Sequence, residues 1–290
     1  MKEGFIMKYR HLLLTLCILA LMFASSAYAG TVLLEDIGEG NYFLPGSNTI
    51  TITGTKGQTI INAVNMIPSG GTINLNGNFK LTETINIKKP VTIRSDTGAI
   101  LDGQGKVRVL RCEGNGFVLE NLTIKGGNYT EGGGINIDKC TIDIINCKII
   151  GNTSLMGGGI NIKGNSTVNM TDCEISGNTA SKLWIAGGVG AGIYAYGGTL
   201  TMTNCTVTNN TAQSKGGGLY LSGTTASAID CNISGNTPDD VQGTLKRYVT
   251  VTQSNEQESD EDSGGGCNAA GLGLVSLAAV LIMRKRLIHA

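Results

Sequence analysis

TIDIINCKIIGNTS at 141–154, TVNMTDCEISGNTA at 167–180, TLTMTNCTVTNNTA at 199–212 and SAIDCNISGNTP at 227–238 are four versions of one block. Each block carries one cysteine, and these cysteines are spaced by 26, 32 and 26 residues: Cys147, Cys173, Cys205 and Cys231. Self-similarity at such a period indicates a repeat architecture, in which each unit stacks on its neighbours.

A triplet of small residues precedes each block: Gly132–Gly134, Gly157–Gly159, Gly190–Gly192 and Gly216–Gly218. Alternating apolar residues follow each triplet, as in Ile160 and Ile162. This period of two predicts strands and not helices. Glycine at tight turns explains why 43 of the 290 residues are Gly.

Each repeat therefore predicts three short strands with a corner at residues such as Asp172, which is one coil of a parallel β-helix. Weaker alternation extends the pattern back to residue 72, so residues 72–251 predict about seven coils. Thr59–Ile67 can form a helix with one apolar side, which we expect to cap the N-terminal coil. The predicted organisation is a signal peptide (1–29), an N-terminal segment (30–56), the β-helix (57–251), an acidic linker (252–263) and a sorting or anchor segment (264–290).

Residues 50–250 resemble the right-handed parallel β-helix family, the pectin-lyase-like fold. The stretches GTINLNGNF, INIKKPVTIRSD and AILDGQG resemble the N-terminal coils of that family, and the GGGI and GNTA elements resemble repeats of bacterial surface β-helix proteins. The resemblance implies an all-β solenoid. It does not imply one activity, because this fold occurs in lyases, hydrolases, adhesins and phage tailspikes.

The N-terminus carries the pattern of a secretory signal. Lys8 and Arg10 precede an apolar run, and Ala27-Tyr28-Ala29 predicts cleavage after Ala29. The alternative is an uncleaved membrane anchor.

The C-terminus predicts a membrane tether. Gly264, Gly265, Gly266 and Cys267 precede an apolar stretch and the basic cluster Arg284-Lys285-Arg286. This order resembles the Synerg-CTERM sorting domain, which implies cutting by a sorting protease and transfer to the cell surface, with Cys267 as the lipid-attachment site. A plain C-terminal anchor is the alternative.

The four repeat cysteines occupy one slot, which is taken by Leu122 one coil earlier. A slot that accepts Leu is apolar, so we interpret these cysteines as buried thiols, with disulfides between adjacent coils as the alternative. The spacing and the lack of histidine partners argue against a zinc site.

Two columns of polar residues follow the repeat. Asn121, Asn146, Asp172, Asn204 and Asp230 precede the cysteine slot, and Asn152, Asn178, Asn210 and Asn236 follow each coil. We interpret both columns as ladders that satisfy backbone groups at the bends. The functional alternative makes Asp172 and Asp230 catalytic or calcium-binding, as weak candidates.

The expected mature body lacks histidine, since His11 and His289 lie in the terminal segments, so Ser-His-Asp chemistry is excluded. The body carries more acids than bases, which argues against nucleic-acid binding. The sequence also has no credible phosphate-binding loop, and we expect no cofactor.

The longer interval between Cys173 and Cys205 places an insertion around Trp184. Insertions in solenoids often lie on the binding face, so Trp184, Tyr194 and Tyr196 are candidates for ligand contact. The alternative is that Trp184 folds down to cover the rod. The sequence thus predicts an exported, surface-tethered, non-catalytic β-helix protein that binds an extracellular glycan or a host or envelope surface. A polysaccharide lyase or glycoside hydrolase acting on acidic polysaccharides is the alternative.

Overall fold

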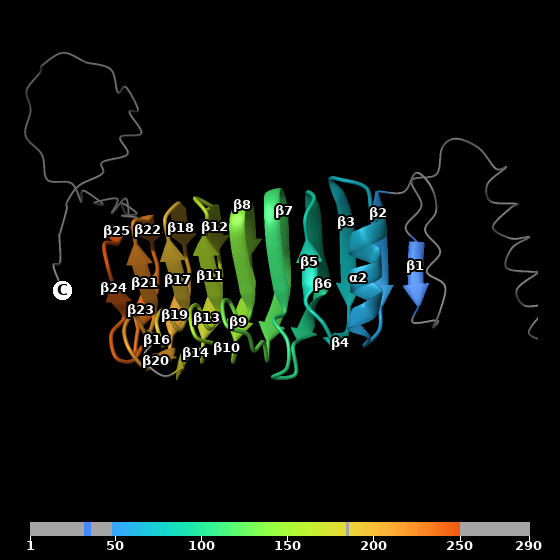
Figure 1. Cartoon of the computed structure of the whole chain (residues 1–290). Coiled ribbons are helices and arrows are strands. Elements are labelled where there is room, and N and C mark those ends of the chain that lie inside the picture. Colours follow the sequence, from blue (N-terminus) through green and yellow to red (C-terminus); the bar gives the residue numbers. More distant parts are fainter. Residues whose placement is uncertain (1–31, 36–47, 184–185, 250–290) are drawn as a thin grey trace, which may run out of the picture.

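A computed structural model describes residues 32–35, 48–183 and 186–249. Their strands stack side by side into an elongated parallel β-helix of about seven coils, which confirms the predicted fold class (Figure 1). Each coil contributes a strand to three faces in turn. Among the described residues, no helix is both long and apolar enough to cross a membrane.

The first face contains β1 (Val32–Glu35), β2 (Thr49–Thr53), β3 (Gly71–Asn76), the start of β6 (Val91–Asp102), the middle of β7 (Leu110–Lys125), the end of β8 (Ile135–Ile145), β12 (Thr167–Thr171), β18 (Thr199–Thr203), β22 (Thr225–Ile229) and β25 (Lys246–Tyr248). The second face contains β4 (Asn78–Lys80), the ends of β6 and β7, β9 (Lys148–Ile150), β13 (Glu174–Ser176), β19 (Thr206–Thr208) and β23 (Asn232–Ser234). The third face contains β5 (Ile85–Ile87), the starts of β7 and β8, β11 (Ile160–Lys163), β17 (Ile193–Tyr196), β21 (Leu219–Ser222) and β24 (Val241–Gln242).

Two smaller sheets complete the strands. β10 (Thr153–Ser154), β14 (Thr179–Ala180) and β20 (Thr211–Ala212) pair in parallel beside the coils. β15 (Lys182–Leu183) and β16 (Ala186–Gly187) form an antiparallel hairpin at the predicted insertion.

The predicted capping helix is present as α2 (Gly57–Met66), beside β2 and β3 at the N-terminal end of the rod (Figure 1). Its side chains Ile60, Ala63 and Val64 are buried. β2 precedes the helix, so the solenoid begins earlier in the chain than the predicted boundary at residue 57.

The core is a continuous apolar interior filled by alternate residues of every strand. Ile135, Ile137, Ile160 and Ile162 are completely buried, and the register joins them coil to coil. The cysteine slot is also interior: Cys147, Cys173 and Cys205 are buried, and all six described cysteines are free thiols. The predicted interior position is therefore confirmed for Cys147, Cys173 and Cys205, whereas Cys231 is only partly buried.

An interior ladder of asparagine side chains ties the coils together at the turn after the second face. The Nδ2 groups of Asn152, Asn178 and Asn210 each donate to the Oδ1 of the next rung at 2.9–3.1 Å, and Asn236 donates to Asp240. The same amides donate to backbone carbonyls, and their oxygens accept backbone N–H groups of the preceding coil. The predicted backbone-satisfying role of this column is confirmed.

Two physical reasons require glycine in the triplets. The first glycine of each triplet, such as Gly157, has a positive φ of 60–66° in all four repeats. The later glycines have no room for a side chain: a Cβ on Gly158 would lie 2.5 Å from the carbonyl oxygen of Thr179. Glycine is thus needed both for a left-handed turn and for close approach of neighbouring coils.

Candidate functional site

The column of Asn and Asp before the cysteine slot consists of left-handed corner residues. Asn121, Asn146, Asp172, Asn204 and Asp230 all have φ between 49° and 55°. Asn and Asp tolerate this conformation better than other residues with a Cβ, which explains why these two types alternate.

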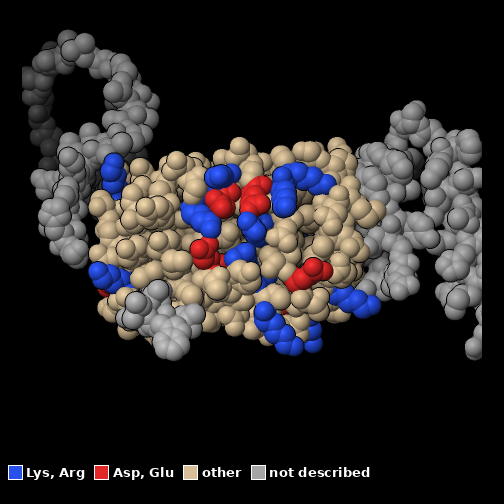
Figure 2. Space-filling model, in the orientation of Figure 1, with Lys and Arg blue, Asp and Glu red and all other residues tan. Residues whose placement is uncertain are grey.

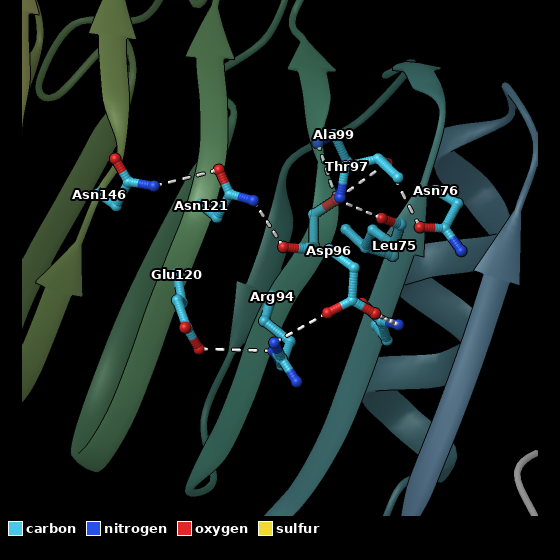
Figure 3. A network of polar contacts seen from close by, with 11 residues as sticks. Leu75, Asn76, Arg94, Asp96, Thr97, Ala99, Glu120, Asn121 and Asn146 are labelled. Atoms are coloured by element: carbon cyan, nitrogen blue, oxygen red, sulfur yellow. Dashed lines mark hydrogen bonds and ion pairs between the residues drawn. The ribbon is translucent and has the colours of Figure 1, made fainter.

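Hydrogen bonds link several of these corners between coils. Asn146 Nδ2 donates to Asn121 Oδ1 at 3.3 Å, and Asn204 Nδ2 donates to Asp172 Oδ1 at 2.5 Å. In the first of these pairs, Asn121 also donates to the carbonyl of Ser95, as Figure 3 shows. Among the described residues, no group of three or more His, Cys, Asp or Glu side chains could hold a metal ion. Catalysis by Asp172 and Asp230, the weaker alternative, stays untested.

An ion-pair network lies on the first face beside these corners. Arg94 is 2.9 Å from Asp96 and 3.4 Å from Glu120, and Asn74 donates to Asp96 at 2.7 Å (Figure 3). Arg94 pairs with two carboxylates, so it does not present an unpaired charge. The network joins three coils, because its members come from β3, β6 and β7.

The third face carries a different set of outward side chains, in two parallel columns. The first column contains Arg111, Asn136, Asn161, Tyr194 and Tyr220, which the strand register places one above another. Within this column, Asn136 and Asn161 are buried, and Asn161 Nδ2 donates to Asn136 Oδ1 at 2.6 Å. The second column, two residues further along each strand, contains Glu113, Asp138, Lys163, Tyr196 and Ser222.

The tyrosines lie toward the C-terminal end of this face. The rings of Tyr194 and Tyr220 stack with centroids 5.2 Å apart and planes 5° from parallel. Tyr196 is 61% exposed, so it offers a ring to solvent beside the stacked pair. Burial raises the pKa of Tyr194, and the neighbouring Tyr220, Tyr196 and Glu131 add to the increase. Tyr194 is therefore a neutral hydroxyl at physiological pH.

Charged side chains lie on the same face as these tyrosines, and they form ion pairs with one another. Lys163 Nζ lies 2.6 Å from Glu131 Oε2, and Arg111 pairs with Glu113. Figure 2 shows acidic and basic side chains close together over the middle of the rod.

A buried arginine fixes the loop that supplies Glu131. Arg108 donates through Nε and Nη2 to the Glu131 carbonyl at 3.0 and 2.8 Å, and its guanidinium lies 4.1 Å from the centre of the Tyr129 ring. Burial lowers the pKa of Arg108 from its ordinary value. An arginine side chain nonetheless keeps its charge at physiological pH. Arg108 therefore holds the Glu131 backbone in place for the pair with Lys163.

Loops form a wall along this face. Glu131, Met156, Val189 and Lys215 pair in sequence through single β-bridges, one from each coil. The β15–β16 hairpin joins this wall just before Val189, and a Cβ on the following Gly190 would lie 2.7 Å from the Cα of Tyr194. The insertion thus enters the wall beside the third face.

The three predicted contact residues have different outcomes. Tyr194 and Tyr196 lie together on the third face, whereas Trp184 lies outside the described residues. Ala29 and Gly264–Cys267 lie outside the described residues too. Both interpretations of Trp184 and the predictions for these terminal residues therefore stay predictions.

Sequence reasoning missed Tyr220, Arg108 and the Lys163–Glu131 pair. Tyr220 lies 26 residues after Tyr194, which is the common repeat interval, so the repeat alignment could have placed the two rings together. The pair between Lys163 and Glu131 joins a strand to a loop of another coil, and no repeat spacing indicates it.

A hollow on the second face is a weaker candidate. It has a volume of about 190 Å³ and is lined by Asn78, Lys80, Ile100, Asp102 and Lys125. This is smaller than the roughly 300 Å³ at which pockets begin to enclose a small ligand. The third face, with its exposed aromatic ring and its wall of loops, is the better candidate for an extended ligand.

Comparison with protein families gives a match over most of the rod. The family described as right handed beta helix region matches residues 37–255. The chain belongs to this family. Membership agrees with the parallel coils and with the resemblance in the sequence.

Comparison with solved structures gives the same fold. The chain is similar to an alginate lyase from Paenibacillus sp. str. FPU-7, with a TM-score of 0.50 and 17% identity, over 70% of this chain and 75% of that one. At this identity the similarity shows the fold alone. No curated protein matches the sequence.

Proposed function

We propose that this β-helix protein is exported, is tethered to the cell surface through its C-terminus, and binds an extracellular polysaccharide along its third face without catalysis. The observation that carries the proposal is the exposed ring of Tyr196 beside the Tyr194–Tyr220 stack and the Lys163–Glu131 pair. An aromatic ring offers a flat apolar surface to a sugar, and the neighbouring charged groups can hydrogen-bond its hydroxyls.

The shape of the site supports an extended ligand. Lys163, Tyr196 and Ser222 of the second column belong to three successive coils, and coils repeat at about 4.8 Å. A polymer lying along the rod would therefore contact several coils at once. The sorting-domain resemblance, with Cys267 as the attachment point, supports display of this rod at the cell surface.

Two features favour binding over catalysis. Lys163 and Arg111 are each paired with a carboxylate, Glu131 and Glu113 respectively, so neither presents an unpaired group to a ligand. The raised pKa of Tyr194 keeps its phenol protonated. A protonated Tyr194 can donate a hydrogen bond to a glycan without abstracting a proton from it.

A direct test compares retardation of the purified protein in gels that contain alginate, pectate or dextran. We expect retardation by at least one polysaccharide, with Tyr196→Ala weakening it about tenfold, because the exposed ring is lost. Tyr248→Ala is the matched control, since Tyr248 is an exposed tyrosine on the first face. Equal retardation of both variants and of the parent would refute binding at the third face. The Trp184→Ala variant, run in the same gels, tests whether the insertion around Trp184 contributes to polysaccharide binding.

The second candidate is a lyase acting on acidic polysaccharides. It is favoured by the similarity to a protein whose name is alginate lyase and by the closeness of Tyr194 to Glu131, the partner of Lys163. A lyase leaves unsaturated ends that absorb ultraviolet light. Growth of that absorbance with alginate or pectate, abolished by Lys163→Ala, would establish catalysis and overturn the non-catalytic proposal.

The tether is tested separately, by mass spectrometry of the form released from membranes. Removal of the tail near Gly264–Gly266 with a modified Cys267 would support the sorting signal. An intact C-terminus that ends at Ala290 would instead support a plain anchor.

A further inference from the structure

The interior cysteines form a column with one thiol per coil. Cys147, Cys173, Cys205 and Cys231 immediately precede the second-face strands β9, β13, β19 and β23, which are paired in parallel register. Backbone bonds join the same positions: Thr206 N donates to the Cys173 carbonyl at 2.8 Å, and Asn232 N donates to the Cys205 carbonyl at 2.9 Å. Successive Cα atoms therefore lie about one strand spacing apart, roughly 4.8 Å, within the 4.4–6.8 Å found in disulfides.

Stacked residues are nevertheless slightly too far apart at Cβ. Their Cβ atoms also follow the spacing of about 4.8 Å, whereas disulfides usually need about 3.5–4.5 Å. Closing the bond requires a small inward shift of one coil. Cys147, Cys173 and Cys205 are buried in coils that are paired on both sides, so a shift there would disturb two interfaces.

The last pair differs in two ways and is already in contact. Cys231 is only partly buried, so an oxidant can reach it. The strand that follows it, β23, pairs with β19 and is the last strand of the second face among the described residues, so a shift of Cys231 disturbs one interface on this face and not two. The backbone N–H of Cys205 already donates to the Cys231 sulfur at 3.3 Å.

We propose that Cys205 and Cys231 are a modification site that is oxidised to a disulfide, which staples the last coil of the second face. The oxidant is a low-molecular-weight disulfide. The Cys231 thiolate attacks one of its sulfur atoms, forms a mixed disulfide and releases one small thiol. The Cys205 thiolate then displaces the second small thiol. Two electrons pass from the cysteines to the oxidant, and their two protons are taken up by the two released thiolates.

The buried position makes this reaction slow but does not prevent it. Burial raises the pKa of Cys231, and a hydrogen bond with Cys173 together with burial raises the pKa of Cys205. Few thiolates are therefore present at neutral pH. The reaction is expected to start at Cys231, because its sulfur is the accessible one.

Peptide mapping of the full chain tests the proposal. Reduced protein is incubated with oxidised glutathione, its remaining thiols are alkylated, and it is digested with trypsin without reduction. Cleavage after Lys182 and Lys215 separates Cys173, Cys205 and Cys231 into three peptides. We expect one linked pair, Cys205 with Cys231. Alkylation or stable glutathionylation of Cys231, or a link from Cys205 to Cys173, would overturn the proposal.

Two variants and one thermal measurement complete the test. Cys147→Ser should keep the linked peptide, and Cys231→Ser, at a partly exposed position, should lose it while the protein still folds. Oxidation should raise the unfolding midpoint of the parent by about 5 °C or more and leave that of Cys231→Ser unchanged, because the bond closes a loop of about 26 residues. A linked peptide without a higher midpoint would refute the stapling role. None of these outcomes depends on polysaccharide binding.

Discussion

Replacing Asn178 by alanine tests whether the interior amide ladder is a main source of stability. The side chain is completely buried and takes part in four hydrogen bonds. Its Nδ2 donates to the Ile149 carbonyl and to Asn210 Oδ1, both at 2.9 Å. Its Oδ1 accepts the backbone N–H of Asn152 at 3.0 Å and the amide of the same residue at 3.1 Å.

The magnitude follows from these four contacts. Each intramolecular hydrogen bond contributes about 1 kcal/mol net, and removing one partner leaves the other buried and unsatisfied. Asn178→Ala should therefore lower the free energy of unfolding by about 4 kcal/mol. Asn169→Ala is the control in the same coil, because Asn169 is exposed and bonds only through its amide to Asp143. That control should lose less than about 1 kcal/mol.

Equilibrium unfolding in guanidinium chloride measures both effects. With a slope of about 5 kcal/mol/M, a loss of 4 kcal/mol moves the midpoint by about 0.8 M. A shift for Asn178→Ala no larger than that of Asn169→Ala would show that the ladder adds little stability, and would refute the reasoning from buried partners.

Three further outcomes follow from the coil geometry. Asp172→Ala should be less stable than Asp172→Gly by about 1 kcal/mol in chemical unfolding, because the corner has a positive φ; equal stability would contradict the left-handed assignment. Gly158→Ala should cost about 1–3 kcal/mol, since its Cβ would press on the Thr179 carbonyl, and an unchanged unfolding midpoint would argue against that close contact. The hydrogen bond from Ser176 lowers the pKa of Glu174, so this carboxylate stabilises the fold above its unfolded pKa and the contribution disappears as pH falls. Glu174→Gln should thus be slightly less stable than the parent near pH 7 and equally stable near pH 3, and a constant difference across this range would refute the assignment.

The repeat made most of the fold predictable. Residues in one repeat position meet the same environment in every coil, so four aligned blocks reveal which positions are interior, which form corners and which need glycine. The slot shared by Leu122 and Cys147 is an example: Leu122 is buried, and it lies one coil before Cys147. The start of the solenoid was harder to place, because β2 belongs to a coil that α2 completes in place of strands.

The candidate site was only partly predictable. Tyr194 and Tyr196 stood out because they follow the insertion, and the strand register places both on one face. The ring stack with Tyr220 depends on the register between coils, and the Lys163–Glu131 pair depends on the path of a loop. Lys163 and Glu131 occupy different positions of the repeat, so the repeat period does not indicate that they are in contact.

The sequence by itself determined the parallel β-helix, its glycine turns, its asparagine ladders and its buried cysteine column. It did so because backbone hydrogen bonding between stacked coils forces equivalent residues into equivalent places. Only the tertiary structure decided which outward side chains meet, which charges are paired and which cysteine is partly exposed. These properties depend on the direction of side chains and on the pairing of strands near the ends of the described stack, where the repeat is less regular.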